Sequence, residues 1–377
     1  MLPSSNFDVV PTSLLPPNAS RYELLRAGPE PSEVKVMLTI WAVVSLLVAI
    51  AGTTLVVAII SSRRTRHSAF DLYLAALAVP DLFLGWNCFI ACTIRTGDGA
   101  YEAHGALCLW QGVFTSFGVA ASFWINAIVA HDLYALLLKT KQCENYSPPT
   151  PAVVLCRCIC AYAFSALVSS VPLFQGFPVD IYMLRGLICT PVDTDLTSTV
   201  LYWLGLTPFI TGIPMMYTCG VILVCWHREL VPNFPRLRFA HHSSAKETPQ
   251  DLLASGTTGD AQERRARRAR AVSLYFFRLF LALIGMQTPG LLLLLCLPIR
   301  SPWAFWVGGT MIHLQGLMSV AMGMAKPSVW QAVRDLLGCN HLRAKHANTV
   351  APAPGIILPA KGRNSNPSPI PARLSSQ

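Results

Sequence analysis

Charged and titratable side chains inside long apolar runs are the residues of this chain that could carry chemistry. We single out Asp81, Asp132 and Lys326, together with the imidazoles of His131 and His313. A charged side chain at the centre of a bilayer costs about 2.5–3.5 kcal/mol on insertion scales, and such residues usually pair, bind an ion or relay protons. A functional role is therefore the first hypothesis at these positions.

Asp132 next to His131 is compatible with a proton relay of the kind found in pumps. A relay needs a series of titratable groups across the membrane, and the other apolar runs offer almost none. We favour the alternative in which Asp132 lies at the cytoplasmic mouth of its helix, partly solvated, and contacts the second cytoplasmic loop.

No combination of residues indicates an enzyme or a metal centre. The sequence shows no Ser/His/Asp set, no His-x-x-x-His pair and no phosphate-binding loop. Cys156, Cys158 and Cys160 alternate in the fourth apolar run, but helix residues two apart point in different directions. We therefore predict no catalysis, no metal and no cofactor.

The elements that must position these residues are seven apolar runs. Hydrophobic residues make up 53% of the 377 residues and charged residues only 13%, whereas soluble domains are about one-quarter charged. About 20 apolar residues are enough to cross the hydrocarbon. The sequence therefore predicts an all-α membrane protein, a seven-transmembrane helix bundle, with spans at about Val34–Ile60, Ser68–Ile94, Ala106–Leu138, Pro151–Phe174, Ser198–Cys225, Ala271–Pro298 and Trp303–Ala325.

The distribution of lysine and arginine predicts how the bundle is oriented. The N-terminal segment and the alternate connections after it hold six of these residues, whereas the other set of connections and the C-terminal segment hold twenty-one. Cytoplasmic loops carry the positive excess, so we place the N-terminus outside and the C-terminus inside. The net charge of +10 then reflects topology, and no nucleic-acid partner is predicted. Asn18, in an Asn-x-Ser triplet, is a glycosylation candidate outside, whereas Asn145 lies in a cytoplasmic loop and should stay bare.

The spans divide the chain into four parts. Polar, Pro-rich and Ser-rich stretches cannot bury a core, so they are predicted to be disordered. Cys339, next to the inner leaflet, is a palmitoylation candidate. The predicted parts are an extracellular tail (1–33), the bundle (34–325) with a disordered cytoplasmic loop at about 226–270, an amphipathic juxtamembrane helix (326–340) and a disordered cytoplasmic tail (341–377).

Two cysteines are set apart by their place at the outer face. Cys108 lies at the head of the third span, and Cys189 lies between the fourth and fifth. An oxidising exterior allows them to form a disulfide. The alternative is two unpaired thiols.

Several motifs occur in register along the chain. Residues 77–82 read Leu-Ala-Val-Pro-Asp-Leu and resemble a Leu-Ala-x-x-Asp-Leu motif, and Asp132, Leu133 and Tyr134 resemble an Asp-Arg-Tyr triplet. With Cys108, Ser122 and prolines at 172, 214, 289 and 327, the chain resembles a rhodopsin-like (class A) G-protein-coupled receptor over roughly residues 34 to 340. The resemblance implies an extracellular ligand, a heterotrimeric G protein as partner, contact with membrane lipids and a plasma-membrane, multi-pass location.

Departures from the motifs indicate a divergent member. Leu133 stands where the family has the arginine that contacts the G protein, and Gln287 stands where it has a tryptophan. Lys326 replaces the asparagine of the Asn-Pro-x-x-Tyr motif, of which Pro327 is kept. Conventional coupling is therefore in question, and Leu133→Arg is expected to raise it.

In that family the second-helix carboxylate, here Asp81, binds sodium with partners that match Ser122 and Lys326. A lysine ammonium would supply the positive charge itself, so we predict an internal Asp81–Lys326 pair. The alternative is that Lys326 extends to the cytoplasmic headgroups.

Polar residues in the outer half are candidates for a ligand site. The position that amine receptors use to hold an ammonium group is Thr115, so a biogenic amine is not expected. A mostly apolar pocket with a few hydrogen-bonding groups is predicted, although polar side chains also bind helices to one another in membranes. The candidates are Gln111, Thr115, Gln287, His313 and Gln315.

The function that this pattern favours is transduction of an extracellular ligand signal to a G protein through a receptor with atypical activation motifs. Two alternatives stay open, a seven-helix scaffold or trafficking protein that does not signal, and a small-molecule transporter. Against the transporter, the sequence shows no internal repeat or pair of broken helices of the kind that build midplane sites.

Overall fold

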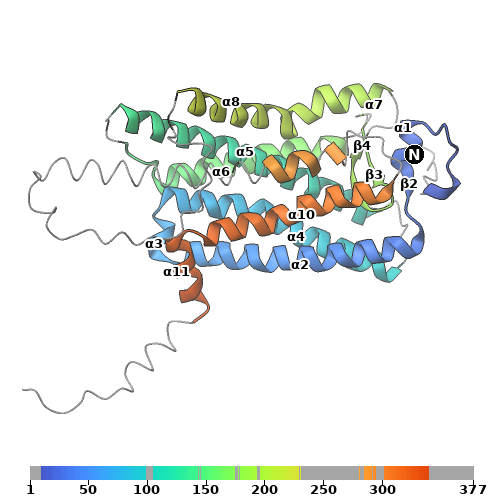
Figure 1. The fold of residues 1–377 in the computed structure, drawn as a ribbon, viewed down its shortest axis with the longest axis horizontal. Helices are drawn as coiled ribbons and strands as arrows, with labels where there is room; N and C mark the ends of the chain where they lie inside the picture. The colour runs from blue at the N-terminus through green and yellow to red at the C-terminus, as the bar shows by residue number, and fades with distance from the viewer. Residues whose placement is uncertain are drawn as a thin grey trace, which may run out of the picture. The chain divides into compact units, whose positions relative to one another are not determined.

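A computed structural model describes residues 10–98, 105–142, 144, 146–174, 177, 179–192, 196–228, 230, 280, 284–290, 292–293 and 301–338. Long helices lie alongside one another, with a β-hairpin and an N-terminal segment at one end (Figure 1). Asn145, which is predicted to carry no glycan, and Cys339, the palmitoylation candidate, lie outside the described residues. The same is true of the tail at 341–377, most of the loop at about 226–270 and most of the sixth predicted span.

Helices make up most of the described chain. The long ones are α2 (Pro31–Ser61), α4 (Ala69–Asp98), α5 (Ala106–Lys141), α6 (Pro151–Ser170) and α10 (Pro302–Met324). A further long stretch joins α7 (Leu196–Val200), η3 (Leu201–Leu206), η4 (Pro208–Gly212) and α8 (Ile213–His227). Within the described residues, five stretches are long and apolar enough to cross a membrane, and they coincide with the first five predicted spans. The shorter elements are η1 (Thr12–Leu14), α1 (Arg21–Arg26), α3 (Arg63–Arg66), η2 (Val171–Leu173), α11 (Pro327–Leu336) and the strands β1 (Val10–Pro11), β2 (Ala27–Gly28), β3 (Asp180–Leu184) and β4 (Ile188–Val192).

Proline marks where several helices begin. Pro31, Pro151, Pro302 and Pro327 occupy the first turns of α2, α6, α10 and α11, where the missing N–H costs nothing and the fixed φ suits a helix. α11 lies within the segment for which an amphipathic helix is predicted and buries Val329, Ala332 and Val333.

Pro208 changes the geometry of the fifth long stretch. It has no N–H, and its ring would clash with the carbonyl four residues earlier in an α-helix. The chain responds with π-helical turns on both sides: Thr207 N–H donates to Tyr202 O, and Ile213 N–H donates to Pro208 O. Such insertions into α-helices often occur at functional sites.

Small residues let α2, α4 and α10 approach closely. A Cβ placed on Gly85 would lie 3.0 Å from both Ala49 N and Ser45 O, and one placed on Gly316 would lie 2.5 Å from Val48 Cγ1. Close backbone approach through glycine is typical of helix packing in membranes. It sets the position of α4, which carries residues of both sites described below.

The hairpin and the N-terminal segment form a cap over one end of the helices (Figure 1). β3 and β4 are antiparallel, β1 and β2 are parallel, and α1 buries Leu24 and Leu25. The turn residue Arg185 donates its N–H to Leu25 O at 2.8 Å, and its guanidinium carbon lies 5.9 Å from the centre of the Phe305 ring. Burial lowers the pKa of Arg185 to about 10. The cap is therefore packed onto the bundle.

Candidate functional site

Asp132 lies at the centre of a buried polar cluster in the half of the bundle opposite the cap. Arg157 Nη1, from α6, donates to both Asp132 carboxylate oxygens at 2.7 and 2.8 Å, and the Tyr73 hydroxyl, from α4, donates to Oδ2 at 2.6 Å. Asp132 is 5% exposed, whereas the Arg157 side chain is 41% exposed. The expectation that Asp132 is partly solvated and held by a loop is therefore corrected: its main partners are on two neighbouring helices.

Sequence reasoning missed Arg157. The available signal was that Arg157 is the charged residue of the fourth apolar run, and a charge at that depth calls for a partner. The connection that follows α5 also approaches this cluster, because Tyr146 packs against the surrounding apolar core. Burial, with the nearby Asp132 charge, raises the pKa of Tyr146 to about 12.

The residues beside Asp132 face different surroundings. Leu133 is 3% exposed and packs in the same apolar core as Tyr73. Tyr134 OH accepts a hydrogen bond from Arg228 Nη1 at 3.2 Å, and His131 Nδ1 lies 2.7 Å from Tyr217 OH. His131 therefore contacts α8 and does not extend a chain from Asp132.

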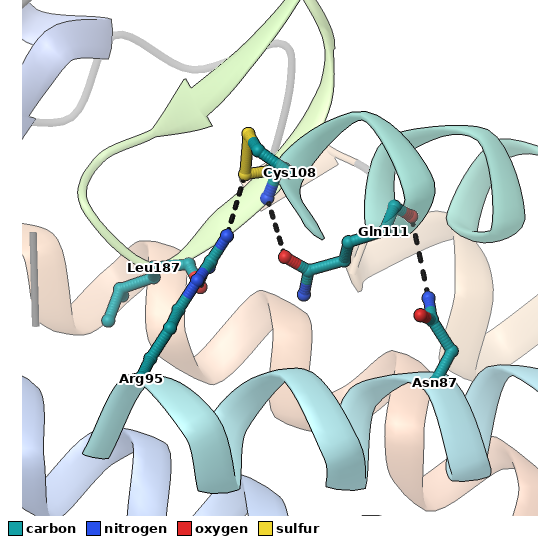
Figure 2. Close-up of a disulfide and its surroundings, with 6 residues drawn as sticks. Asn87, Arg95, Cys108, Gln111 and Leu187 are labelled. Carbon is teal, nitrogen blue, oxygen red and sulfur yellow. Dashed lines mark hydrogen bonds between the residues drawn. A yellow bond between two sulfur atoms is a disulfide. The ribbon is translucent and has the colours of Figure 1, made fainter. Parts of the chain in front are cut away.

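At the other end, a disulfide joins the cap to α5 and confirms the predicted pairing. Cys108 and Cys189 are bonded at 2.05 Å. Arg95 donates to Leu187 O at 3.1 Å and approaches Cys189 Sγ at 2.7 Å (Figure 2). Gln111 Oε1 accepts from Cys189 N–H at 3.3 Å (Figure 2). Gln111 thus binds the backbone of the hairpin.

A cavity of about 220 Å³ lies below the hairpin. Two of the five ligand-site candidates, Thr115 and His313, line it, whereas Gln111, Gln287 and Gln315 are buried elsewhere among the described residues. Its walls come from α4, α5, the hairpin, the π-helical stretch (η3 and η4), α8 and α10, with two residues of the sixth apolar run. The lining residues are Leu84, Thr115, Ser116, Val119, Leu184, Ile188, Thr190, Tyr202, Trp203, Thr207, Ile210, Thr211, Met215, Thr288, Leu292, Gly309, Ile312 and His313.

Comparison with known proteins identifies the family. The sequence profile of the family described as "7 transmembrane receptor (rhodopsin family)" matches residues 52–302. The chain belongs to the rhodopsin family of seven-transmembrane receptors. A crystal structure of squid rhodopsin is similar in fold, with a TM-score of 0.60 at 11% identity, over 90% of this chain and 98% of that one. No curated protein sequence matches.

Membership of the rhodopsin family makes the chain a multi-pass membrane protein of a class of signalling receptors. Within this receptor, the aspartate of the triplet is bound by Arg157 of α6, and the next position, Leu133, is turned into the core. The departure at Leu133 thus coincides with an arginine supplied from another helix.

The predicted Asp81–Lys326 pair is wrong in this receptor. Lys326 Nζ lies 2.5 Å from Asp71 Oδ1, and Asp71 is buried in the first turn of α4. Asp81 lies ten residues further along α4, which at 1.5 Å per residue is about 15 Å away. Lys326 follows the end of α10 and lies at the level of the start of α4. It therefore pairs with the Asp71 carboxylate, which is nearer than that of Asp81.

Asp81 keeps neutral neighbours at mid-helix. It is 9% exposed, and its described polar partner is the Ser319 side chain of α10. Ser122 on α5 is also buried, and Pro327 opens α11 directly after Lys326. The predicted switch residues therefore divide into separate groups around Asp132, Asp81 and Lys326.

Proposed function

We propose that this receptor spans the membrane seven times with the cap outside, and transmits an extracellular ligand signal at the plasma membrane to a cytoplasmic heterotrimeric G protein. The disulfide supports this orientation, because such bonds persist in oxidising compartments. Asn18 is exposed in the capping segment, consistent with a glycan on that side.

The Asp132–Arg157–Tyr73 cluster carries the proposal. A buried carboxylate is stable only when a counter-charge and hydrogen bonds compensate its lost hydration. Here both compensations come from other helices, so the cluster ties α4, α5 and α6 together. Arg157 is partly exposed, so a shift of these helices would return its guanidinium to solvent and leave Asp132 without its counter-charge. This gives a two-state element that a ligand could bias.

The proposal is tested by recruitment of G proteins in cells, with each variant corrected for its surface level. Arg157→Gln should raise basal recruitment, because it removes the contact that holds the resting arrangement. Arg64→Gln is the matched control, since Arg64 is an exposed arginine that bonds only the neutral Gln331 in the described structure. If neither wild type nor Arg157→Gln recruits any G-protein subtype at normal surface level, the signalling proposal is refuted and the two alternatives, a scaffold that does not signal and a transporter, remain.

A further inference from the structure

The lining of the cavity below the hairpin has little charge. Among the described residues that line it there is no Asp, Glu, Lys or Arg. His313 is the titratable imidazole in the wall, and both its nitrogens are engaged: Nδ1 lies 3.4 Å from Ser45 Oγ, and Nε2 lies 3.3 Å from Cys88 Sγ. A charged ligand would lose its hydration here without a compensating partner, which is strongly unfavourable.

Trp203 and Thr207 line the cavity, and each carries a buried polar atom, Trp203 Nε1 and Thr207 Oγ1, without a hydrogen-bond partner in the described structure. Both atoms are shielded, so a rotation of each side chain is needed to present them to a ligand. The two residues are four apart along the π-helical stretch before Pro208, so they lie on one side of it. Indole nitrogen can only donate, whereas a hydroxyl can donate or accept. Each unsatisfied buried group costs about 1–3 kcal/mol, which a ligand acceptor would recover.

The size of the cavity limits the ligand. A cavity of about 150 Å³ lined by apolar side chains holds benzene, so about 220 Å³ holds a molecule moderately larger than benzene.

We propose that this cavity binds an uncharged, mostly apolar ligand whose acceptor oxygen, of the carbonyl type, receives hydrogen bonds from Trp203 Nε1 and Thr207 Oγ1. The inference rests on the proposed receptor function and specifies its ligand class. The remaining lining, from Leu84, Val119, Ile210 and Leu292 among others, would contact the apolar part.

Four probes of the same size and shape test the proposal directly. Acetophenone carries the acceptor, α-methylstyrene replaces its oxygen by a methylene, benzoate is an anion and benzamidine is a cation. Binding is measured as the dose-dependent rise in the thermal midpoint of the full chain in lipid nanodiscs. Acetophenone should stabilise the wild type at lower concentration than any of the other three.

Two variants locate the hydrogen bonds. Trp203→Phe and Thr207→Val should each weaken acetophenone binding roughly two- to tenfold, the usual worth of one hydrogen bond, and leave α-methylstyrene unchanged. Thr218→Val is the matched control, because Thr218 on α8 lies outside the described cavity lining and its hydroxyl donates to Pro214 O at 2.9 Å. A variant that unfolds without probe is replaced by Trp203→Tyr or Thr207→Ala, each measured against its own probe-free midpoint.

Three results would overturn the proposal: equal binding of acetophenone and α-methylstyrene, tighter binding of either ion, or no stabilisation by acetophenone up to its solubility limit. The measurement involves no G protein, so a receptor that binds acetophenone as described but recruits no G protein refutes only the signalling proposal. A receptor that recruits G protein without distinguishing the probes refutes only the ligand class.

Discussion

Removing Arg157 should destabilise the receptor measurably, because Asp132 would keep its burial and lose its counter-charge. Breaking a fully buried ion pair costs about 3–5 kcal/mol, whereas an exposed pair contributes about 0–1 kcal/mol. Asp132 is buried but the Arg157 side chain is 41% exposed, so solvent screens part of the interaction. We expect Arg157→Gln to cost about 2 kcal/mol, between these limits.

The assay is thermal unfolding of purified receptor in lipid nanodiscs. With about 2–4 °C lost per kcal/mol in large domains, Arg157→Gln should lower the midpoint by roughly 4–8 °C. Arg157→Lys keeps the positive charge but loses the planar guanidinium group. Its thermal midpoint should therefore lie between those of wild type and Arg157→Gln. The control Arg64→Gln should stay close to wild type, since exposed substitutions usually change stability by less than about 0.5 kcal/mol.

A double-mutant cycle decides whether the loss comes from the pair. Asp132→Asn with Arg157→Gln removes both charges, so its cost should be clearly smaller than the sum of the single costs. If the costs add, or if Arg157→Gln unfolds at the wild-type midpoint, the two side chains do not stabilise each other and the argument for the cluster is wrong.

Three further outcomes follow from the same structure. Asp71→Asn and Lys326→Gln should each lower the midpoint, with the double variant recovering part of the loss, and additive losses would contradict the pair. Cys108→Ala and Cys189→Ala should each reduce surface expression with the double variant no worse than either, whereas free alkylation of both thiols in the native receptor would contradict the disulfide. Leu133→Arg should lower the midpoint by more than Leu133→Met, because it places a charge in the apolar core. The burial of Leu133 thus replaces the sequence-based expectation that this change raises G-protein recruitment; a gain in recruitment at wild-type stability would show that the core opens there.

The sequence predicts the elements well and the polar pairs poorly. The length of the apolar runs is sufficient to predict five helices that, in the structure, are long and apolar enough to cross a membrane. This prediction needs only the length and the composition of each run. The outer disulfide also follows from topology, since Cys108 and Cys189 share one face. Pairing inside the bundle depends instead on the relative height and rotation of helices, which a single sequence does not encode locally. Lys326 is accordingly matched to Asp71 rather than to Asp81.

The ligand-site candidates show the same limit. A selection by polarity alone picks Gln111 and Gln315 as readily as Thr115. In the structure, however, Gln111 bonds to the hairpin, and Gln315 is absent from the described cavity lining. Trp203 and Thr207 were missed because an aromatic and a threonine in an apolar run look like ordinary lipid-facing or packing residues. Pro208 was the available signal, because a proline inside a long helix changes which side chains face inward.

Leu133 and Arg157 are best understood together. Adjacent residues of a helix point about 100° apart, so Asp132 can face α4 and α6 while Leu133 faces the core. An arginine at 133 would have to leave that core to reach solvent, whereas Arg157 reaches both Asp132 and solvent from α6 without rearrangement. Leu133 is therefore compatible with an ion pair at Asp132 in this receptor, because Arg157 of the neighbouring helix α6 supplies the positive charge.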